Sequence, residues 1–381
     1  MGDDYRECSF CVMDTSDPEI SFDEHQRCNH CREFERLLGR AWFPNEEGAR
    51  RLDGILARIR AEGRGREFDC LLGLSGGVDS SYLALKAFEW GLRPLVVHVD
   101  TGWNSELSVQ NVERIVKHTG FELHTHVVNW ETMRDLQLSY LRAGIANQDV
   151  PQDHAIFAGL YHFAEKSRVR FVLSGGNYAT EAILPRAWLG FAMDARNLRA
   201  INRRFGNGSL EGFPTIGFFK YYIENPLIRR MTPVRPLNYM PYSQTAAVAY
   251  LESEVGWRNY PRKHGESLFT RFFQNYYLPT RFGYDKRRPH LSTLIAAGSI
   301  GRDEAARLLA EPLYDKAELA RDREYICRKL RIGQEELEAF MEAPVHQYSE
   351  FANWDRWHSV LKRTQRLAER ISGRSVTVYS S

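Results

Sequence analysis

The sequence predicts an α/β fold in which helices flank a parallel sheet. Between residues 69 and 177, short apolar segments alternate with amphipathic segments, the order that produces parallel strands joined by crossover helices. Four cysteines fall within the first 31 residues, and the segments after residue 240 show helical periodicity. We therefore expect an N-terminal zinc knuckle, a central sheet and a helical C-terminal region.

The composition is that of an ordinary globular protein of 381 residues, which allows two to three domains of about 150 residues each. Apolar residues make up 43% and charged residues 26%, so a hydrophobic core is available. The 51 basic residues nearly balance the 49 acidic ones, which argues against a nucleic-acid-binding protein. The chain shows neither a membrane-length apolar run nor a secretory signal. We expect a cytoplasmic protein.

Changes in pattern along the chain predict four parts. Residues 1–40 form a zinc-binding module, and residues 41–66 form a helical linker. Residues 67–242 contain the alternating strands and helices, and residues 243–381 form the helical region that binds substrate or a partner.

The predicted strands are short apolar runs bounded by turn residues, as in strands buried on both faces of a sheet. Prolines at the ends of the last run favour an edge strand. The strands are expected at 69–74, 94–99, 123–129, 170–177 and 233–240.

The predicted helices carry apolar residues at helical spacing, as at Leu52, Ile55, Leu56 and Ile59. Ser105 is a typical helix cap, and Gly120 a typical stop. The helices are expected at 44–66, 80–90, 105–119, 130–144, 154–168, 243–255, 266–278, 292–298, 301–310, 315–330 and 353–371.

Two CxxC pairs predict a metal site in the N-terminal module. Cys8 and Cys11 are separated from Cys28 and Cys31 by residues 12–27, a spacing that suits four thiolates around zinc. An iron centre and a set of unrelated reduced thiols are the alternatives. Because four protein ligands close the coordination sphere, we expect a structural or docking role.

The segment Ser75-Gly76-Gly77-Val78-Asp79-Ser80 follows a buried strand and begins a helix. Glycines allow close approach of a phosphate, and the helix N-terminus offers unpaired N–H groups. The segment lacks the lysine of a Walker A loop and the pattern of a dinucleotide-binding loop. A tight turn with a helix cap is the alternative interpretation.

This segment resembles the pyrophosphatase loop of the ATP pyrophosphatases, the PP-loop superfamily, whose fold is HUP-like (adenine nucleotide alpha hydrolase-like). NAD, GMP and asparagine synthetases belong to that superfamily. The resemblance implies that the chain cleaves ATP between its α and β phosphates and transfers AMP to a substrate oxygen. It assigns ATP and pyrophosphate to Ser75, Gly76, Gly77, Asp79 and Ser80, with Asp79 also catalytic.

Two later segments agree with that resemblance. Asp100 ends the second predicted strand, and Gly175 begins the GGNYATE turn after the fourth. The resemblance places both near the nucleotide and makes Asp79 and Glu181 candidate Mg²⁺ ligands. Gly176 stands where related synthetases have threonine. An ordinary cap or surface acid remains the alternative for Asp100 and Glu181.

The combination of the cysteine module, PQDH at 151–154, GGNYATE at 175–181 and the segment 264–305 is similar to the N-acetyl sugar amidotransferases, the WbpG/PseA-like family. The resemblance implies ATP-dependent conversion of an N-acetyl group of a UDP-linked diacetamido sugar to an acetamidino group. The pathway implied is biosynthesis of lipopolysaccharide O-antigen. The implied partners are a HisH-like glutaminase subunit and a cyclase-like, HisF-like ammonia-channel subunit.

Three cations follow a tight turn at Asp285: Lys286, Arg287 and Arg288. Such a cluster suits an anionic substrate or the leaving pyrophosphate, since arginine binds oxyanions through two parallel hydrogen bonds. We expect Lys286 and Arg287 to be catalytic and Arg288 to contact substrate. A solvated helix surface is the alternative.

The remaining substrate candidates lie in two segments. Glu266, Thr270 and Arg271 are expected on one helix, with Glu266 and Thr270 on the same face. Asp153 and His154 are candidates for substrate contact or proton transfer, and a structural histidine is an equal alternative for His154.

Two other functions compete with amidination. A tRNA-modifying PP-loop enzyme of the thiolation type would need reactive cysteines, and outside the CxxC pairs the chain has only Cys70 and Cys327. A non-enzymatic zinc-ribbon scaffold would need an inert loop, which the intact Ser75, Asp79 and Ser80 argue against.

Overall fold

The computed structural model, which describes residues 5–260 and 265–372, contains one five-stranded parallel sheet in the order β3-β2-β1-β4-β5. This confirms the predicted fold class. The strand order reverses beside β1, since β2 and β3 lie on one side of it and β4 and β5 on the other. Such a switch point is where open α/β sheets bind ligands. The strands are β1 Cys70–Gly73, β2 Pro94–Asp100, β3 Leu123–Val127, β4 Phe171–Leu173 and β5 Thr232–Val234.

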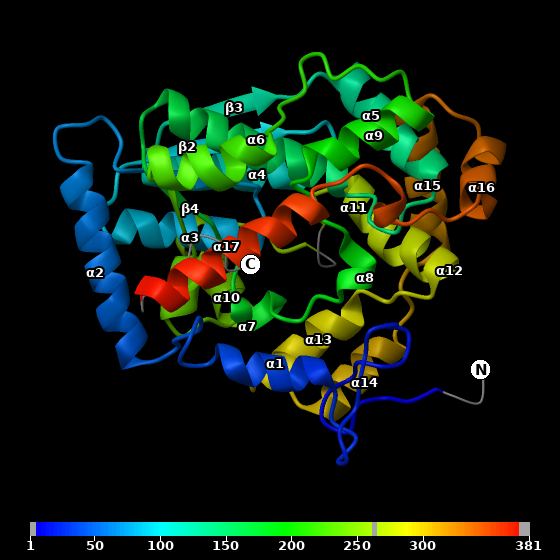
Figure 1. Ribbon diagram of the computed structural model, residues 1–381, viewed down its shortest axis with the longest axis horizontal. Coiled ribbons are helices and arrows are strands. Elements are labelled where there is room, and N and C mark those ends of the chain that lie inside the picture. Colours follow the sequence, from blue (N-terminus) through cyan, green and yellow to red (C-terminus); the bar gives the residue numbers. More distant parts are fainter. Residues whose placement is uncertain (1–4, 261–264, 373–381) are drawn as a thin grey trace.

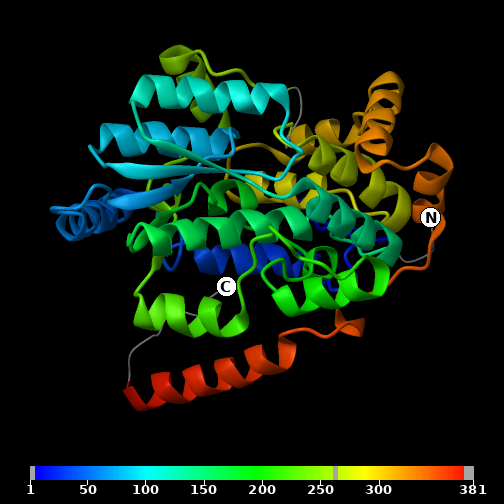
Figure 2. The ribbon, with the colours of Figure 1, turned by 90° about the horizontal axis from the view of Figure 1, so that it is seen from above.

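Helices cover both faces of the sheet (Figure 2). Because neighbouring strand residues point to opposite faces, Leu72 enters one hydrophobic cluster and Leu71 the other. The first cluster contains side chains of α2 Glu46–Glu62, α3 Val78–Glu89, α4 Glu106–Thr119 and α10 Gln244–Val255. The second contains side chains of α5 Trp130–Ala143, α6 Val150–Lys166 and α9 Ala195–Phe205.

The region after residue 243 shares these cores. Phe269, Tyr277 and Ile326 pack in the same cluster as Leu71. Its elements are α11 Leu268–Phe272, the π-helix η3 Phe273–Tyr277, α12 Leu278–Phe282, α13 Arg287–Ala296, α14 Arg302–Ala310, α15 Lys316–Leu330, α16 Gln334–Glu342, the 3₁₀-helix η4 Tyr348–Glu350 and α17 Asp355–Ser372.

The shorter elements complete the molecule. They are α1 Asn29–Leu37, α7 Tyr178–Glu181, α8 Arg186–Leu189, the π-helix η1 Lys220–Ile228 and the 3₁₀-helix η2 Pro236–Tyr239. Within residues 5–260 and 265–372, no helix combines the length and apolar character that a membrane crossing requires.

Several boundaries differ from the expected ones for local reasons. Helix α6 begins at Val150 rather than 154, because Pro151 fits the first turn of a helix. The fifth strand ends at Val234, and Pro236 then begins a 3₁₀ turn. The expected helix caps are confirmed: Ser105 accepts a hydrogen bond from Ser108 N, and Gly120 adopts φ +67°.

Candidate active site and cysteine cluster

The loop of residues 75–80 lies at the carboxyl end of β1 and leads directly into α3. Gly76 has φ +83°, and a Cβ atom there would lie 2.5 Å from the Ser108 carbonyl oxygen, so glycine is required. The Gly76 carbonyl oxygen accepts hydrogen bonds from Trp257 Nε1 at 3.2 Å and Tyr260 OH at 2.8 Å. Two side chains from a distant segment therefore fix the loop. The backbone N–H groups in the first turn of α3 have no partner within the helix and can bind an anion.

The two serines of the loop lie together. Ser75 Oγ and Ser80 Oγ are 3.0 Å apart, and Ser80 Oγ also donates to the Gly77 carbonyl oxygen at 3.2 Å. A Cβ atom on Gly77 would lie 3.5 Å from Glu266 Oε1, so the Glu266 carboxylate stands beside the loop. The structure thus brings the hydroxyl donors expected from the sequence into one small space with an acid from the C-terminal region.

Asp79 and Gly175 join the loops that follow β1 and β4. The Asp79 carboxylate accepts a hydrogen bond from the Tyr242 hydroxyl. Burial and the negative charge of Asp79 raise the pKa of Tyr242, so the phenol stays a donor. A Cβ atom on Gly175 would lie 2.8 Å from the Asp79 carbonyl carbon. Only glycine lets the two loops approach this closely.

Asp100 orders the loop after β2. Its Oδ1 accepts hydrogen bonds from Gly102 N at 2.8 Å and Asn104 Nδ2 at 3.0 Å. Asn104 Nδ2 also lies 3.0 Å from His98 Nε2, and His98 Nδ1 donates to the Leu74 carbonyl oxygen at 2.7 Å. Asp100 therefore acts as a local cap one strand away from the loop of residues 75–80, and its contact with a nucleotide stays a prediction.

Glu181 ends the single-turn helix α7. The Asn177 side chain caps this turn by accepting from Thr180 N at 3.0 Å, and His290 Nδ1 donates to the Thr180 carbonyl oxygen at 2.9 Å. Glu181 Oε2 lies 4.0 Å from the position that a Gly176 Cβ atom would occupy. The half-buried carboxylate is thus fixed at the exit of β4.

Asp153, Glu181 and Lys286 lie close enough to influence one another, although they come from three distant segments. Burial and the negative charges of Asp149 and Glu181 raise the pKa of Asp153 to about 8, and the positive charge of Lys286 opposes that rise. A carboxyl group that exchanges a proton near neutral pH is typical of active sites.

His154 is a buried structural histidine, contrary to the expected substrate role. Its Nδ1 donates to the Ala192 carbonyl oxygen at 2.9 Å, and its Nε2 accepts from Ile216 N at 3.3 Å. Burial lowers the pKa of His154 to about 4. The neutral ring therefore uses both nitrogen atoms to join α6 to two loops.

Glu266 lies outside the helix on which it was expected. Helix α11 begins only at Leu268, because the Ser267 side chain caps it. The Glu266 carbonyl oxygen accepts from Ser105 N at 2.8 Å, and Leu268 N donates to the Trp103 carbonyl oxygen at 2.9 Å. Residues 266–268 are thus paired with the loop after β2, so Glu266 and Thr270 do not share a helix face.

Thr270 belongs to a polar network at the start of α6. Its hydroxyl donates to Asp149 Oδ1 at 3.0 Å, which also accepts from Gln152 Nε2 at 2.9 Å. Gln152 Oε1 accepts from Ser267 Oγ at 3.1 Å and from Thr101 Oγ1 at 3.2 Å. The network connects β2, α6 and α11 at the sheet edge.

The three cations at 286–288 diverge and do not form the expected cluster. Arg287 Nη2 lies 2.7 Å from Asp285 Oδ2, and its guanidinium donates to carbonyl oxygens at the end of α14. Arg288 Nε lies 3.0 Å from Asp14 Oδ2. Both arginines connect parts of the protein, so the expected catalytic role of Arg287 and substrate contact of Arg288 are corrected to structural ones. Of the three, Lys286 is the one whose positive charge influences Asp153.

Arg271 is also occupied within the protein. Its Nη2 lies 2.6 Å from Asp322 Oδ1, and its Nη1 lies 3.5 Å from Glu318 Oε1. The ion pairs join α11 to α15, so the expected substrate contact is again replaced by a structural one.

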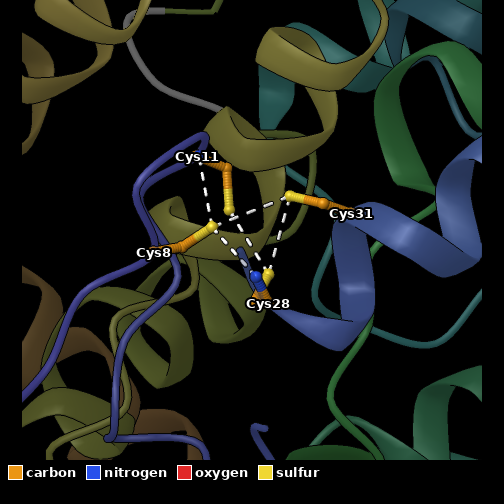
Figure 3. Close-up of side chains that lie close together, drawn as sticks. All are labelled: Cys8, Cys11, Cys28 and Cys31. Carbon is orange, nitrogen blue, oxygen red and sulfur yellow. Dashed lines mark hydrogen bonds between the residues drawn. The ribbon is translucent and has the colours of Figure 1, made fainter. Parts of the chain in front are cut away.

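The four cysteines of the N-terminal module converge (Figure 3). Cys8 and Cys31 Sγ are 3.9 Å apart, Cys11 and Cys28 Sγ are 3.7 Å apart, and Cys28 and Cys31 Sγ are 3.6 Å apart. Zn–S distances near 2.3 Å in a tetrahedron require sulfur atoms about 3.8 Å apart. All four are buried and free of disulfides, and Cys28 N donates to Cys8 Sγ at 3.2 Å. The donor set fits zinc.

The cysteine module packs against α13 and α14 (Figure 1). Leu291, Ile295 and Ala305 share its hydrophobic cluster. Val12 N donates to Ser292 Oγ at 3.2 Å, and Arg302 Nε donates to the Cys11 carbonyl oxygen at 3.2 Å. The module is therefore built onto the C-terminal region.

Residues 266–364 match the family model described as the LPS biosynthesis protein WbpG-like, C-terminal domain. This segment of the chain is therefore similar to the C-terminal domain of WbpG-like proteins. The parallel sheet, with the loop of residues 75–80 at the β1/β4 switch point, has the α/β architecture predicted from the sequence. No curated protein sequence matches this chain.

Two solved structures are similar to this chain. NMN synthetase from Francisella tularensis has 12% identity and a TM-score of 0.35, with 76% of this chain and 96% of that chain covered. The NH3-dependent NAD synthetase from Campylobacter jejuni subsp. jejuni NCTC 11168 has 12% identity and a TM-score of 0.29, with 55% and 93% covered.

Sequence reasoning missed several residues that shape the site. Tyr242, Trp257 and Tyr260 hold the loop of residues 75–80 from a distant segment. Their aromatic character was visible, but only the folded chain shows which loop they contact. Arg235 was missed as well, although a cation directly after an edge strand lies at the ligand-binding edge of a parallel sheet.

Proposed function

We propose that this chain is an ATP-dependent amidotransferase that converts an N-acetyl group of a UDP-linked diacetamido sugar to an acetamidino group. The observation that carries the proposal is the convergence of the loop of residues 75–80 with Gly175, Glu181, Asp153 and Lys286. Lys286 belongs to the segment, residues 266–364, that matches the WbpG-like C-terminal domain. A phosphate-binding loop, acids and one cation are what adenylyl transfer requires.

In this proposal the loop of residues 75–80 binds the phosphates of MgATP, and two carboxylates bind the Mg²⁺ ion. Backbone N–H groups of the α3 N-terminus and the hydroxyls of Ser75 and Ser80 bind the pyrophosphate portion. Among the described residues, only the cysteines form a preassembled cluster of three or more ligands. Mg²⁺ is commonly bound by one or two carboxylates together with phosphates, so Asp79 and Glu181 fit it. When bound, Mg²⁺ neutralises phosphate charge.

The reaction replaces one oxygen atom by nitrogen. The N-acetyl carbonyl oxygen forms a bond to the α-phosphorus of ATP, and the bond to pyrophosphate breaks. Ammonia then adds to the activated carbon, AMP departs with the former carbonyl oxygen, and a proton is released. Lys286 stabilises the charge that develops during transfer, and we assign the deprotonated form of Asp153 to accept the released proton.

The ammonia comes from a partner in this proposal. Cys70 and Cys327, the cysteines outside the metal-binding cluster, are both buried, and burial raises the pKa of each thiol. Neither suits a glutaminase nucleophile or a thiolation reaction. A HisH-like glutaminase with a HisF-like channel subunit would supply ammonia. Turnover with glutamine by this chain alone, as fast as with ammonium, would contradict the need for that partner.

We also propose that Cys8, Cys11, Cys28 and Cys31 hold a structural zinc ion. The sulfur separations and the buried N–H to sulfur contact support this assignment. Elemental analysis of the purified protein is expected to find about one zinc ion for each chain.

The decisive experiment labels the N-acetyl carbonyl of a UDP-diacetamido uronic acid with oxygen-18. Purified protein, MgATP and ammonium are added, and AMP and sugar are examined by mass spectrometry. The proposal expects the label in AMP and replacement of one sugar oxygen by NH. Label retained in the sugar, or AMP without label, would show that this oxygen is not adenylylated.

A further inference from the structure

Arg235 directly follows β5 and lies at the same carboxyl edge of the sheet as the active-site loops. Its side chain is exposed, and its Nε lies 3.8 Å from the position that a Gly176 Cβ atom would occupy. Within the described part of the chain, no hydrogen bond or ion pair engages its guanidinium group. Arg235 therefore adds to the proposed active site a cation that is available to an anionic ligand.

Two phenol groups lie within the field of Arg235. Tyr161 on α6 and Tyr221 on η1 have ring centroids 5.8 Å apart and ring planes at 88°. Burial raises the pKa of both phenols, and the positive charge of Arg235 acts in the opposite direction. Neither hydroxyl hydrogen-bonds to another residue that the structure describes. Both stay protonated, so each is a donor for an oxyanion.

Gly176 leaves the approach to Arg235 open. The atoms nearest to a Cβ built there are Ser174 Oγ at 3.5 Å, Arg235 Nε at 3.8 Å and Glu181 Oε2 at 4.0 Å, which are ordinary contacts. A side chain would therefore fit, but it would occupy the space between Arg235 and Glu181. Since Arg235 forms no ion pair with Glu181, that space joins a cation to the candidate Mg²⁺ ligand.

We propose that Arg235, with the hydroxyls of Tyr161 and Tyr221, binds an oxyanion of the acceptor substrate. A carboxylate of the sugar and a phosphate of its nucleotide share this chemistry, and a guanidinium group binds either through paired N–H donors. The assignment rests on the proposed function and adds a substrate-binding residue to it. Bound at this point, the acceptor would lie across Gly176 from the adenylyl-transfer groups.

The test measures binding rather than turnover. Isothermal titration calorimetry is carried out on the full chain with MgATP, a UDP-diacetamido uronic acid and its neutral hexose counterpart. Arg235→Gln is expected to weaken binding of the uronic acid roughly 10- to 100-fold and leave MgATP unchanged, since hydrogen bonds to charged groups contribute about 1.5–3 kcal/mol. Arg235→Lys should recover part of the lost affinity for the uronic acid. Tyr161→Phe and Tyr221→Phe should each weaken that affinity by a smaller factor than Arg235→Gln does.

The two sugars distinguish the sources of the oxyanion. If Arg235 binds the carboxylate, Arg235→Gln removes the preference for the uronic acid; if it binds the diphosphate, both sugars weaken equally. Arg230→Gln is the matched control, because Arg230 is exposed just before β5. Unchanged sugar binding, or weakened MgATP binding, in Arg235→Gln overturns this assignment. A wild-type protein that binds neither sugar overturns the proposed function itself.

Discussion

The cysteine module and the site at the sheet edge are built in opposite ways. The module takes its four sulfur atoms from residues 8–31, so a short continuous segment completes it. The site takes Ser75, Asp153, Glu181 and Glu266 from four segments far apart in the chain. The difference means that local spacing can specify a metal cluster, whereas a catalytic edge depends on how strands and loops pack.

Helix α13 connects the two regions. On one side, Arg288 pairs with Asp14 and Ser292 accepts from Val12 N. On the other, His290 bonds to the Thr180 carbonyl oxygen. Helix α13 thus contacts both the cysteine module and the α7 turn that carries Glu181. Substitutions in one region therefore test how far the stability or binding of the other depends on it.

The largest effect is expected from Cys28→Ser. Loss of one thiolate should abolish zinc binding and lower the free energy of unfolding by more than about 3 kcal/mol, because structural zinc sites supply folding energy. Zinc content by elemental analysis and urea denaturation check this. Cys327→Ser is the control, since Cys327 is a buried cysteine outside the cluster. If Cys28→Ser keeps its zinc, the cluster assignment is wrong.

The next effect separates two adjacent glycines. Gly175→Ala places a Cβ atom 2.8 Å from the Asp79 carbonyl carbon, whereas Gly176→Ala meets nothing closer than 3.5 Å. Overpacking costs about 1–3 kcal/mol of folding stability, and relieving it would move the loop that carries Asp79. Since that loop is proposed to bind MgATP, Gly175→Ala should weaken MgATP binding roughly tenfold. Gly176→Ala should leave it unchanged. Equal MgATP affinities for both variants, measured by calorimetry, would contradict the close contact of the two loops.

A pH titration tests the region around His154. Because the folded-state pKa of about 4 lies below the ordinary value of 6.5, the unfolded state binds the proton more readily. Stability is therefore full above pH 6.5 and is lost as the pH falls toward 4, by up to about 3 kcal/mol. His154→Gln should flatten this part of the profile in urea denaturation. Zinc release, followed with a chromophoric chelator, should keep the same pH dependence, which separates the two regions.

The smallest effect is expected from Tyr242→Phe. It removes the hydrogen bond to Asp79, which should lower the free energy of unfolding by about 1 kcal/mol and weaken MgATP binding a few-fold. Tyr250→Phe is the control, since Tyr250 bonds to Glu89 on an exposed surface. Urea denaturation and calorimetry provide the measurements. A loss of MgATP affinity in both variants would show that the effect is not specific to Asp79.

Much of the site could be predicted where the chemistry is local. The Gly76 conformation, the paired serines and the four cysteines all follow from residue types at fixed spacing. Prediction was poorer for charged side chains on helices. Arg271 and Arg288 looked like substrate ligands, but the folded chain supplies Asp322 and Asp14 as their partners.

The sequence by itself determined the α/β fold, the cysteine cluster and the loop of residues 75–80, because hydrophobic periodicity and glycine or cysteine spacing act over a few residues. Only the tertiary structure decided which distant side chains meet. It brought the charge of Lys286 within reach of Asp153, paired Arg287 with Asp285 and placed Arg235 near Gly176. The partner of a long charged side chain depends on which groups tertiary packing brings near it, and packing depends on the whole chain.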